Sequence, residues 1–126
     1  MALSPEHIDA IGTAEDVHIS TYRSDGSRRR AIPIWTVRVG DGLYIRSALG
    51  SDAAWYRNAT EDNRLHIESG SLATDVALQR APGGEINSRV DAAYRAKYPQ
   101  GGSATTTMVS APATTTTLAL LPIEKH

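Results

Sequence analysis

Apolar and polar residues alternate along several short segments of the chain, and this period of two predicts β-strands. Between residues 16 and 22, Val17, Ile19 and Thr21 alternate with more polar neighbours, as in a strand that is buried on one side. Similar alternation, or a run of residues that favour β-structure, predicts further strands over residues 29–39, 43–47, 64–68, 72–81 and 114–121.

Turn-forming residues separate most of these segments and indicate antiparallel connections. Ser24-Asp25-Gly26-Ser27 precedes the second strand, and Gly40-Asp41-Gly42 predicts a tight hairpin into the third. Pro33 lacks an N–H donor, so it predicts an edge, a bulge or a split in the long segment 29–39.

Helical signals occur at three places. A short helix is expected after Ser4, which would cap it, and Gly12 would end it. A second helix, over residues 53–60, would be capped by Ser51 or Asp52. A third helix would begin at residue 87 or 88 and end at residue 98, before Pro99. The stretch 102–112 is rich in Gly, Ser, Thr and Ala, and we expect a mobile loop there.

Together these elements predict one domain over residues 1–126 that is mainly β with helices (α+β). Six strands with short antiparallel connections favour a small barrel. A short helix would follow the third strand, and another helix would precede the last strand.

Composition narrows the function classes. The chain has 126 residues, a formal net charge of −1 and no cysteine, so disulfides and thiolate chemistry are excluded. The histidines at positions 7, 18, 66 and 126 have no metal-ligand spacing, so we expect no metal. No apolar run is long enough to span a membrane, and the N-terminal residues do not resemble a signal peptide, so a cytoplasmic protein is expected.

Arg28-Arg29-Arg30 is the sharpest charge feature. Arginine matches phosphate geometry with two parallel hydrogen bonds, so the triplet predicts an anion site. Strand alternation would point Arg29 away from Arg28 and Arg30, and the latter two would then face one ligand. A solvated strand end is the equal alternative.

The loop from Ser47 to Ser51, just before a predicted helix, also favours an anion. The chain contains no phenylalanine, and Trp35 or Trp55 could form a wall for a flat ring. For each tryptophan alone, a place in the core or in a dimer interface is the alternative with more general support.

The segment GSRRRAIPIW…GDGLYIRSALGSDAAWYRN resembles the flavin- and deazaflavin-binding split-barrel proteins. In these proteins a basic stretch leads into a strand with a central proline, and a helix similar to Pro-Ala-Trp-Tyr-His-Asn follows the third strand. Here residues 53–58 read Ala-Ala-Trp-Tyr-Arg-Asn, which is more similar to the deazaflavin (coenzyme F-420) nitroreductase-like branch than to pyridoxamine-phosphate oxidases. The later AYRAKYP and TTTTLALLP segments are similar to a small split-barrel family of unknown function.

This resemblance implies a six-stranded antiparallel split β-barrel that forms a homodimer, with FMN or coenzyme F-420 at the subunit interface. The implied cofactor-binding residues are Ser27, Arg28 and Arg30 at the phosphate, Pro33, Ile34, Trp35 and Ser47 along the ring, and Ser51, Trp55 and Arg57 closing the site. The cofactor would transfer hydride to a small organic substrate, so no catalytic residue is assigned. The lysine that commonly meets the FMN phosphate is absent, and the Gly-Gly of the deazaflavin loop is reduced to Gly50, so the cofactor's identity stays open.

Two other functions remain possible. The barrel could bind a cofactor or another phosphate-bearing small molecule without catalysis. It could also bind single-stranded nucleic acid through the arginine triplet, with Trp35 and Tyr22 as stacking platforms. The net charge of −1 counts against nucleic acid, because such binders usually carry a basic excess.

Overall fold

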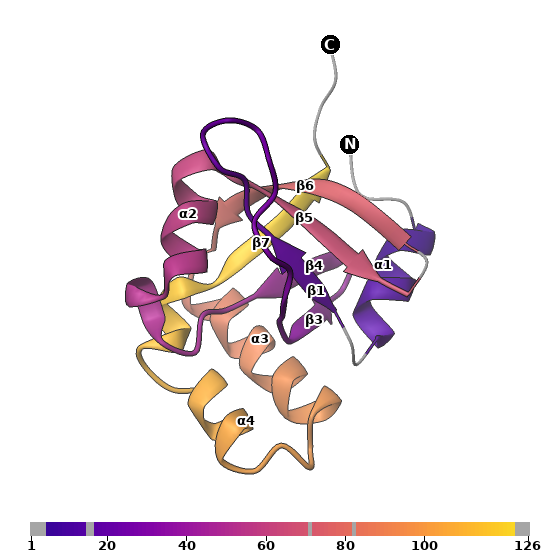
Figure 1. Ribbon diagram of the computed structural model, residues 1–126. Coiled ribbons are helices and arrows are strands. Elements are labelled where there is room, and N and C mark those ends of the chain that lie inside the picture. The colour runs from indigo at the N-terminus through magenta and orange to yellow at the C-terminus, as the bar shows by residue number, and fades with distance from the viewer. Residues whose placement is uncertain (1–4, 15–16, 71, 82, 123–126) are drawn as a thin grey trace.

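The computed structural model describes residues 5–14, 17–70, 72–81 and 83–122 (Figure 1). The elements, in chain order, are α1 (Pro5–Thr13), β1 (His18–Ser20), β2 (Ile32–Pro33), β3 (Thr36–Val39), β4 (Gly42–Ile45), a short 3-10 helix (Gly50–Asp52), α2 (Ala54–Asp62), β5 (Arg64–Ser69), β6 (Leu72–Arg80), α3 (Gly84–Lys97), α4 (Ser103–Met108), a second 3-10 helix (Ala113–Thr116) and β7 (Leu118–Pro122).

All the strands belong to one antiparallel sheet in the order β2-β1-β5-β6-β7-β4-β3. The two end strands, β2 and β3, are consecutive in the chain, so the sheet curls until its edges are joined by a two-residue connection. The result is the expected α+β split barrel, with α3 and α4 gathered on one side of the sheet (Figure 1).

Pro33 explains why the described residues form seven strands where the sequence predicts six. Ile32 and Pro33 pair with β1, and the chain then leaves that edge before Thr36 begins to pair with β4. The N–H of Ile34 donates to the carbonyl of Val17 at 2.9 Å, which anchors the crossing point. The expected split at Pro33 is confirmed.

Two apolar clusters occupy the two faces of the sheet. The larger is built from alternate strand residues, such as Leu43, Ile45, Leu65 and Ile67, and is covered by α1 and α2. Val37 faces the other way and packs with residues of α3 and α4. β4 contributes to both clusters, with Leu43 and Ile45 in the larger one and Tyr44 in the second.

The starts of two helices differ from the prediction. Helix α2 starts at Ala54, and its N-cap Ala53 makes no side-chain cap bond, so the expected capping by Ser51 or Asp52 is wrong; both lie in the 3-10 helix. Helix α3 starts at Gly84, three residues before the expected cap Asn87. The expected cap of the first helix, Ser4, lies outside the described residues.

The segment expected to be a mobile loop, 102–112, contains helix α4. A 3-10 helix at Ala113–Thr116 replaces the start of the strand expected over residues 114–121. Helix α4 was not predicted, because its hydroxyl-bearing residues are also typical of loops. Thr106 and Thr107 each donate to the carbonyl four residues earlier, so their polarity is satisfied within the helix. The buried Met108 then anchors the helix in the second cluster.

Candidate functional site

A groove lies between the β1–β2 loop and the N-terminal half of α2. Its volume is about 350 Å³, which is within the usual range for small-molecule sites, roughly 300 to 1,000 Å³. We call it the arginine–tryptophan groove. Its lining residues are Thr21, Arg29, Arg30, Ile32, Leu49, Ala53, Ala54, Trp55 and Asn58.

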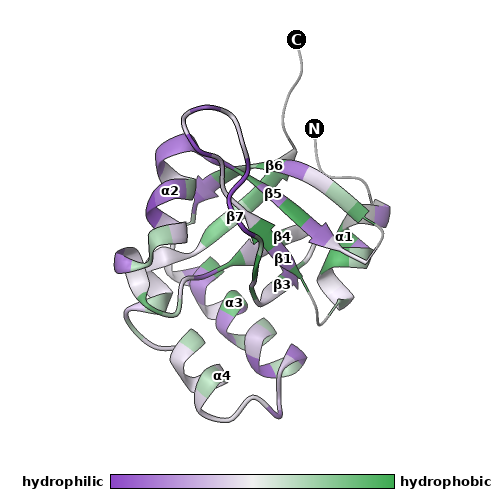
Figure 2. Cartoon of the chain, viewed as in Figure 1, coloured by the Kyte–Doolittle hydropathy of each residue, from purple (hydrophilic) through white to green (hydrophobic). Residues whose placement is uncertain are grey.

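One wall of the groove is formed by residues 21–30, which we call the arginine arm. The arm is a narrow hairpin in which Tyr22 and Arg28 form an isolated bridge, and the N–H of Arg29 donates to the carbonyl of Thr21 at 2.8 Å. It projects beside α2 (Figure 1) and is largely hydrophilic, in contrast to β7 behind it (Figure 2).

A one-residue offset in pairing places two consecutive arginines at the groove. Ile19 and Tyr22 are three positions apart, whereas their partners Ile32 and Arg28 are four positions apart. The second strand therefore has one extra residue between these pairs, which is the definition of a β-bulge. A bulge interrupts strict alternation, so Arg29 and Arg30 can both line the groove.

The two groove arginines differ in their surroundings. The Nη1 of Arg29 donates to the carbonyl of Tyr22 at 2.6 Å and to Oγ1 of Thr21 at 3.3 Å, so this guanidinium is held in place. Arg30 is exposed and has no hydrogen-bond or ion-pair partner among the described residues. One arginine is thus fixed at the groove and the other is available to an anion.

The opposite wall comes from α2 and the loop before it. Trp55 is half-buried and meets the ring of Tyr56 edge-to-face, with centroids 5.8 Å apart. Leu49, which is 73% exposed, stands at the rim, and the side-chain amide of Asn58 has no hydrogen-bond partner in the described part of the chain. An apolar surface with one open amide therefore faces two guanidinium groups, which suits a flat ring that carries an anionic group.

Of the residues predicted to form the site, only Arg30 and Trp55 line this groove. Trp35 lies elsewhere: its ring stacks on Tyr98 with centroids 4.0 Å apart and an interplanar angle of 5°. It borders a separate cavity of about 530 Å³ formed with the C-terminal end of α3 and residues 99–101. The two tryptophans therefore line different cavities of the subunit.

Arg28 points away from the groove and pairs with Glu68 of β5 at 3.2 Å. The prediction that Arg28 and Arg30 converge is corrected here, because the bulge brings Arg29 to the groove in place of Arg28. Ser27 is exposed at the turn of the arm, where its hydroxyl donates to Asp25 at 2.6 Å.

The remaining predicted residues lie around the groove without lining it. Pro33 is exposed on the edge strand β2, and Ile34 is buried in the larger core cluster. Ser51 and Arg57 are both exposed. Ser47 is fully buried, and its N–H donates to Oγ1 of Thr116 at 2.8 Å.

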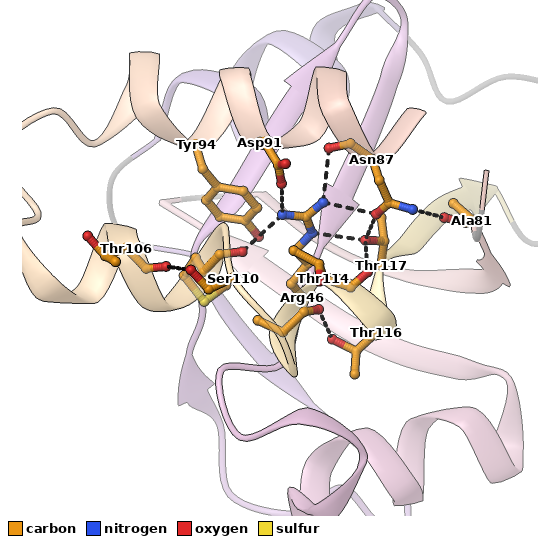
Figure 3. Close-up of polar contacts among 12 residues, drawn as sticks. Arg46, Ala81, Asn87, Asp91, Tyr94, Thr106, Ser110, Thr114, Thr116 and Thr117 are labelled. Carbon is orange, nitrogen blue, oxygen red and sulfur yellow. Dashed lines mark hydrogen bonds and ion pairs between the residues drawn. The ribbon is translucent and has the colours of Figure 1, made fainter. Parts of the chain in front are cut away.

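Sequence reasoning did not identify Arg46, which is fully buried next to Ser47. Figure 3 shows its guanidinium among side chains from α3 and from the segment that leads into β7. It donates to Asp91, Asn87 and Thr117 and to the carbonyl of Met108. This network is structural, and no local signal distinguishes Arg46 from the exposed arginines.

A second polar network joins the arginine arm to the sheet. The hydroxyl of Tyr22 donates to Oδ1 of Asp75 at 2.6 Å. Partial burial is the main cause that raises the pKa of Tyr22, and this hydrogen bond raises it further. Partial burial opposes the ionisation of Asp75, but hydrogen bonds from Tyr22 and His66 hold the pKa of its carboxyl below its usual value. Asp75 is therefore an ionised acceptor at neutral pH.

Across the part of the chain that the structure describes, no three His, Cys, Asp or Glu side chains form a group that could hold a metal ion. Within the same residues, no helix combines the length and the apolar character needed to cross a membrane.

Three solved structures with this fold are similar to most of the chain. An F420-H2 dependent reductase (FDR-A) has a TM-score of 0.59 and 16% identity, over 82% of this chain and 91% of that one. HutZ, the heme storage protein from Vibrio cholerae, has a TM-score of 0.63 and 13% identity, over 99% and 93%. A putative pyridoxamine 5'-phosphate oxidase from Listeria innocua has a TM-score of 0.61 and 8% identity, over 96% and 92%.

At these identities the likeness shows the fold alone, and it confirms the split-barrel resemblance. A search of curated proteins finds no match. Residues 7–120 match the family described as an uncharacterized protein conserved in bacteria (DUF2255). Because the match covers nearly the whole chain, the chain belongs to this family.

Proposed function

We propose that the chain binds a phosphate-bearing flavin or deazaflavin, FMN or coenzyme F-420, in the arginine–tryptophan groove. The observation that carries the proposal is the position of Arg30, a guanidinium without a partner among the described residues, across the groove from Trp55. Arg30 and Arg29 would bind the phosphate, and Trp55 and Leu49 would contact the ring. When bound, such a cofactor supplies hydride transfer, and the protein orients it and excludes water.

The donor set supports this ligand class over heme, although one protein of similar fold is a heme storage protein. The groove residues contain two guanidinium groups, an amide and apolar side chains, but no histidine, cysteine or methionine that could ligate iron. Nucleic acid is also disfavoured. The Tyr22 ring is covered by the Arg64 guanidinium at 3.9 Å, and Trp35 is stacked on Tyr98, so one face of each expected platform is already occupied.

A homodimer is part of the proposal. Leu49 is a large apolar side chain that is 73% exposed at the rim of an open groove, where a second subunit would cover it and exclude water from the ring. Light scattering of the purified protein, alone and with cofactor, tests this. Leu49→Asp should shift the mass toward the monomer, and a monomeric wild type would contradict the dimer.

Titration with FMN, deazaflavin and riboflavin, followed by ligand fluorescence, tests the site. A specific ligand at 100 times its dissociation constant should stabilise the fold by about 2.7 kcal/mol. Arg30→Ala should weaken FMN about tenfold to a hundredfold, since hydrogen bonds to charged groups contribute about 1.5–3 kcal/mol. Riboflavin, which lacks the phosphate, should be affected much less.

Arg80→Ala is the matched control, because Arg80 is an exposed arginine at the end of β6 and does not line the groove. It should leave all affinities unchanged. If neither FMN nor the deazaflavin binds, the hypothesis of a redox cofactor is rejected. Binding that Arg30→Ala leaves intact would place the phosphate elsewhere.

A further inference from the structure

The arginine arm is attached to the sheet on the side that faces away from the groove. Tyr22 and Arg28, which pair across the arm, extend toward strands β5 and β6, whereas Arg29 and Arg30 line the groove. The contacts of Tyr22 and Arg28 with the sheet therefore hold the arm in the position in which Arg29 and Arg30 face the groove.

These contacts form a continuous chain through one histidine. Oδ1 of Asp75 accepts from Tyr22 at 2.6 Å and lies 2.9 Å from Nδ1 of His66. The other ring nitrogen of His66, Nε2, lies 3.1 Å from Oε1 of Glu68, and the same oxygen accepts from Arg28 at 3.2 Å. His66 thus stands between the two carboxylates that hold the arm.

The protonation state of the ring decides whether both of its contacts with carboxylates are favourable. Asp75 accepts from a hydroxyl and Glu68 accepts from a guanidinium, so both serve as ionised acceptors. A neutral imidazole carries one N–H and one lone pair, and the lone pair would face a carboxylate oxygen and be repelled. Only an imidazolium donates from both nitrogens, so both contacts are hydrogen bonds only in the doubly protonated form of the ring.

We propose that His66 is a positioning residue which, as an imidazolium, holds the arginine arm in the conformation that presents Arg29 and Arg30 to an anion in the groove. Loss of the second proton leaves one carboxylate facing a lone pair, loosens the arm and weakens anion binding. The link to the groove rests on the function proposed above, whereas the response of the arm does not.

Other charged groups surround this histidine, and each has a defined place. Arg64 of β5 covers the Tyr22 ring and lies 3.5 Å from Asp62 of α2. His18 of β1 is directly opposite Glu68 in the sheet and so shares its face. The His66 side chain is only 15% exposed, whereas those of Asp75, Glu68 and Arg28 are 34%, 45% and 46% exposed, so His66 is the most enclosed of these four side chains.

The first experiment follows the ligand-free protein by NMR between about pH 5 and pH 8, the range in which histidine changes charge. The imidazole nitrogen shifts of His66 should report an imidazolium at the acidic end. The amide signals of residues 22–28 should change together with them. His66→Gln should abolish this arm response, whereas His18→Gln, which removes the neighbouring histidine, should leave it intact. The proposal is overturned if the amide signals of residues 22–28 do not change with pH, or if they change equally in His66→Gln.

The second experiment measures the affinity of inorganic sulfate by calorimetry over the same pH range, because the charge of sulfate is constant there. Wild-type affinity should fall about two- to fivefold as the pH rises, the ratio expected for loss of a partly exposed ion pair. His66→Gln should give a flat profile. If sulfate does not bind while the arm still responds, the groove assignment fails and the role of His66 in holding the arm stands. If sulfate binds with the same pH profile in His66→Gln, the coupling is refuted.

Discussion

The guanidinium of Arg46 and the carboxylate of Asp91 form an ion pair in the interior, with Nη1 and Oδ1 2.5 Å apart (Figure 3). Arg46 follows β4, Asp91 belongs to α3, and the same guanidinium bonds Thr117 just before β7. One buried side chain thus joins three segments that are far apart in the sequence. It also lies next to Ser47, where the loop that leads to the groove begins.

Replacing Arg46 should be strongly destabilising. Arg46→Met leaves the Asp91 carboxylate, which is 25% exposed, without its partner, and removing one member of a buried pair costs about 3–5 kcal/mol. Urea unfolding measures the loss. Arg80→Met, on an exposed arginine, should change the free energy of unfolding by less than about 0.5 kcal/mol. Equal effects of the two substitutions would contradict the structural role of Arg46.

Gly50 should not tolerate alanine. Its φ of +70° is unfavourable for other residues, and an added Cβ would lie 2.8 Å from Cβ of Pro112. Gly50→Ala should lower the melting temperature and displace the neighbouring Leu49 from the groove rim, which would also weaken ring binding. Gly84→Ala is the control, because a Cβ there meets nothing within 4 Å. A Gly50→Ala protein with unchanged melting temperature would show that the loop adapts freely.

Tyr94 should remain un-ionised in the folded protein at alkaline pH. Burial raises its pKa, and its hydroxyl donates to the carbonyl of Trp35 at 3.0 Å. Because the folded pKa is raised, the contribution of Tyr94 to stability is complete below the unfolded value of about 10 and is lost as the pH rises toward the folded value.

Phenolate absorbance tests this expectation. Wild type and Tyr94→Phe should show the same number of tyrosines ionising before the fold is lost. Tyr94→Phe should also reduce stability at neutral pH by about 1 kcal/mol, through the lost hydrogen bond. One fewer phenolate in the variant before unfolding would mean that Tyr94 titrates in the native state.

Asp75 should contribute acid resistance through Tyr22. The hydrogen bonds of the folded state lower its pKa, so its contribution is present above the unfolded value of about 3.9 and is lost as the pH falls through the lower folded value. Tyr22→Phe removes one of these bonds, and its destabilisation in urea should therefore be larger at pH 6 than at pH 3. Asp75 is 34% exposed, so solvent limits the effect to less than about 1 kcal/mol. A destabilisation that is equal at both pH values would contradict this assignment.

Local patterns were sufficient where the physical cause is local. The strands 64–69 and 72–80 follow from alternation, since one face of each must be buried. The split at Pro33 follows from a missing N–H, and the end of α3 before Pro99 follows from the same chemistry. Helix α4 was missed because threonine hydroxyls that bond within a helix have the same composition as those of a loop.

The sequence by itself determined an antiparallel α+β barrel, and it located a basic strand entrance and the Trp55 helix as candidate walls of a site. Tertiary structure alone decided which side chains meet. The bulge in the arm exchanged Arg28 for Arg29 at the groove, the stacking on Tyr98 took Trp35 to another cavity, and the partners of Arg46 came from three distant segments. Alternation and propensity describe neighbours along the chain, whereas these contacts depend on strand register and on packing between residues that are distant in sequence.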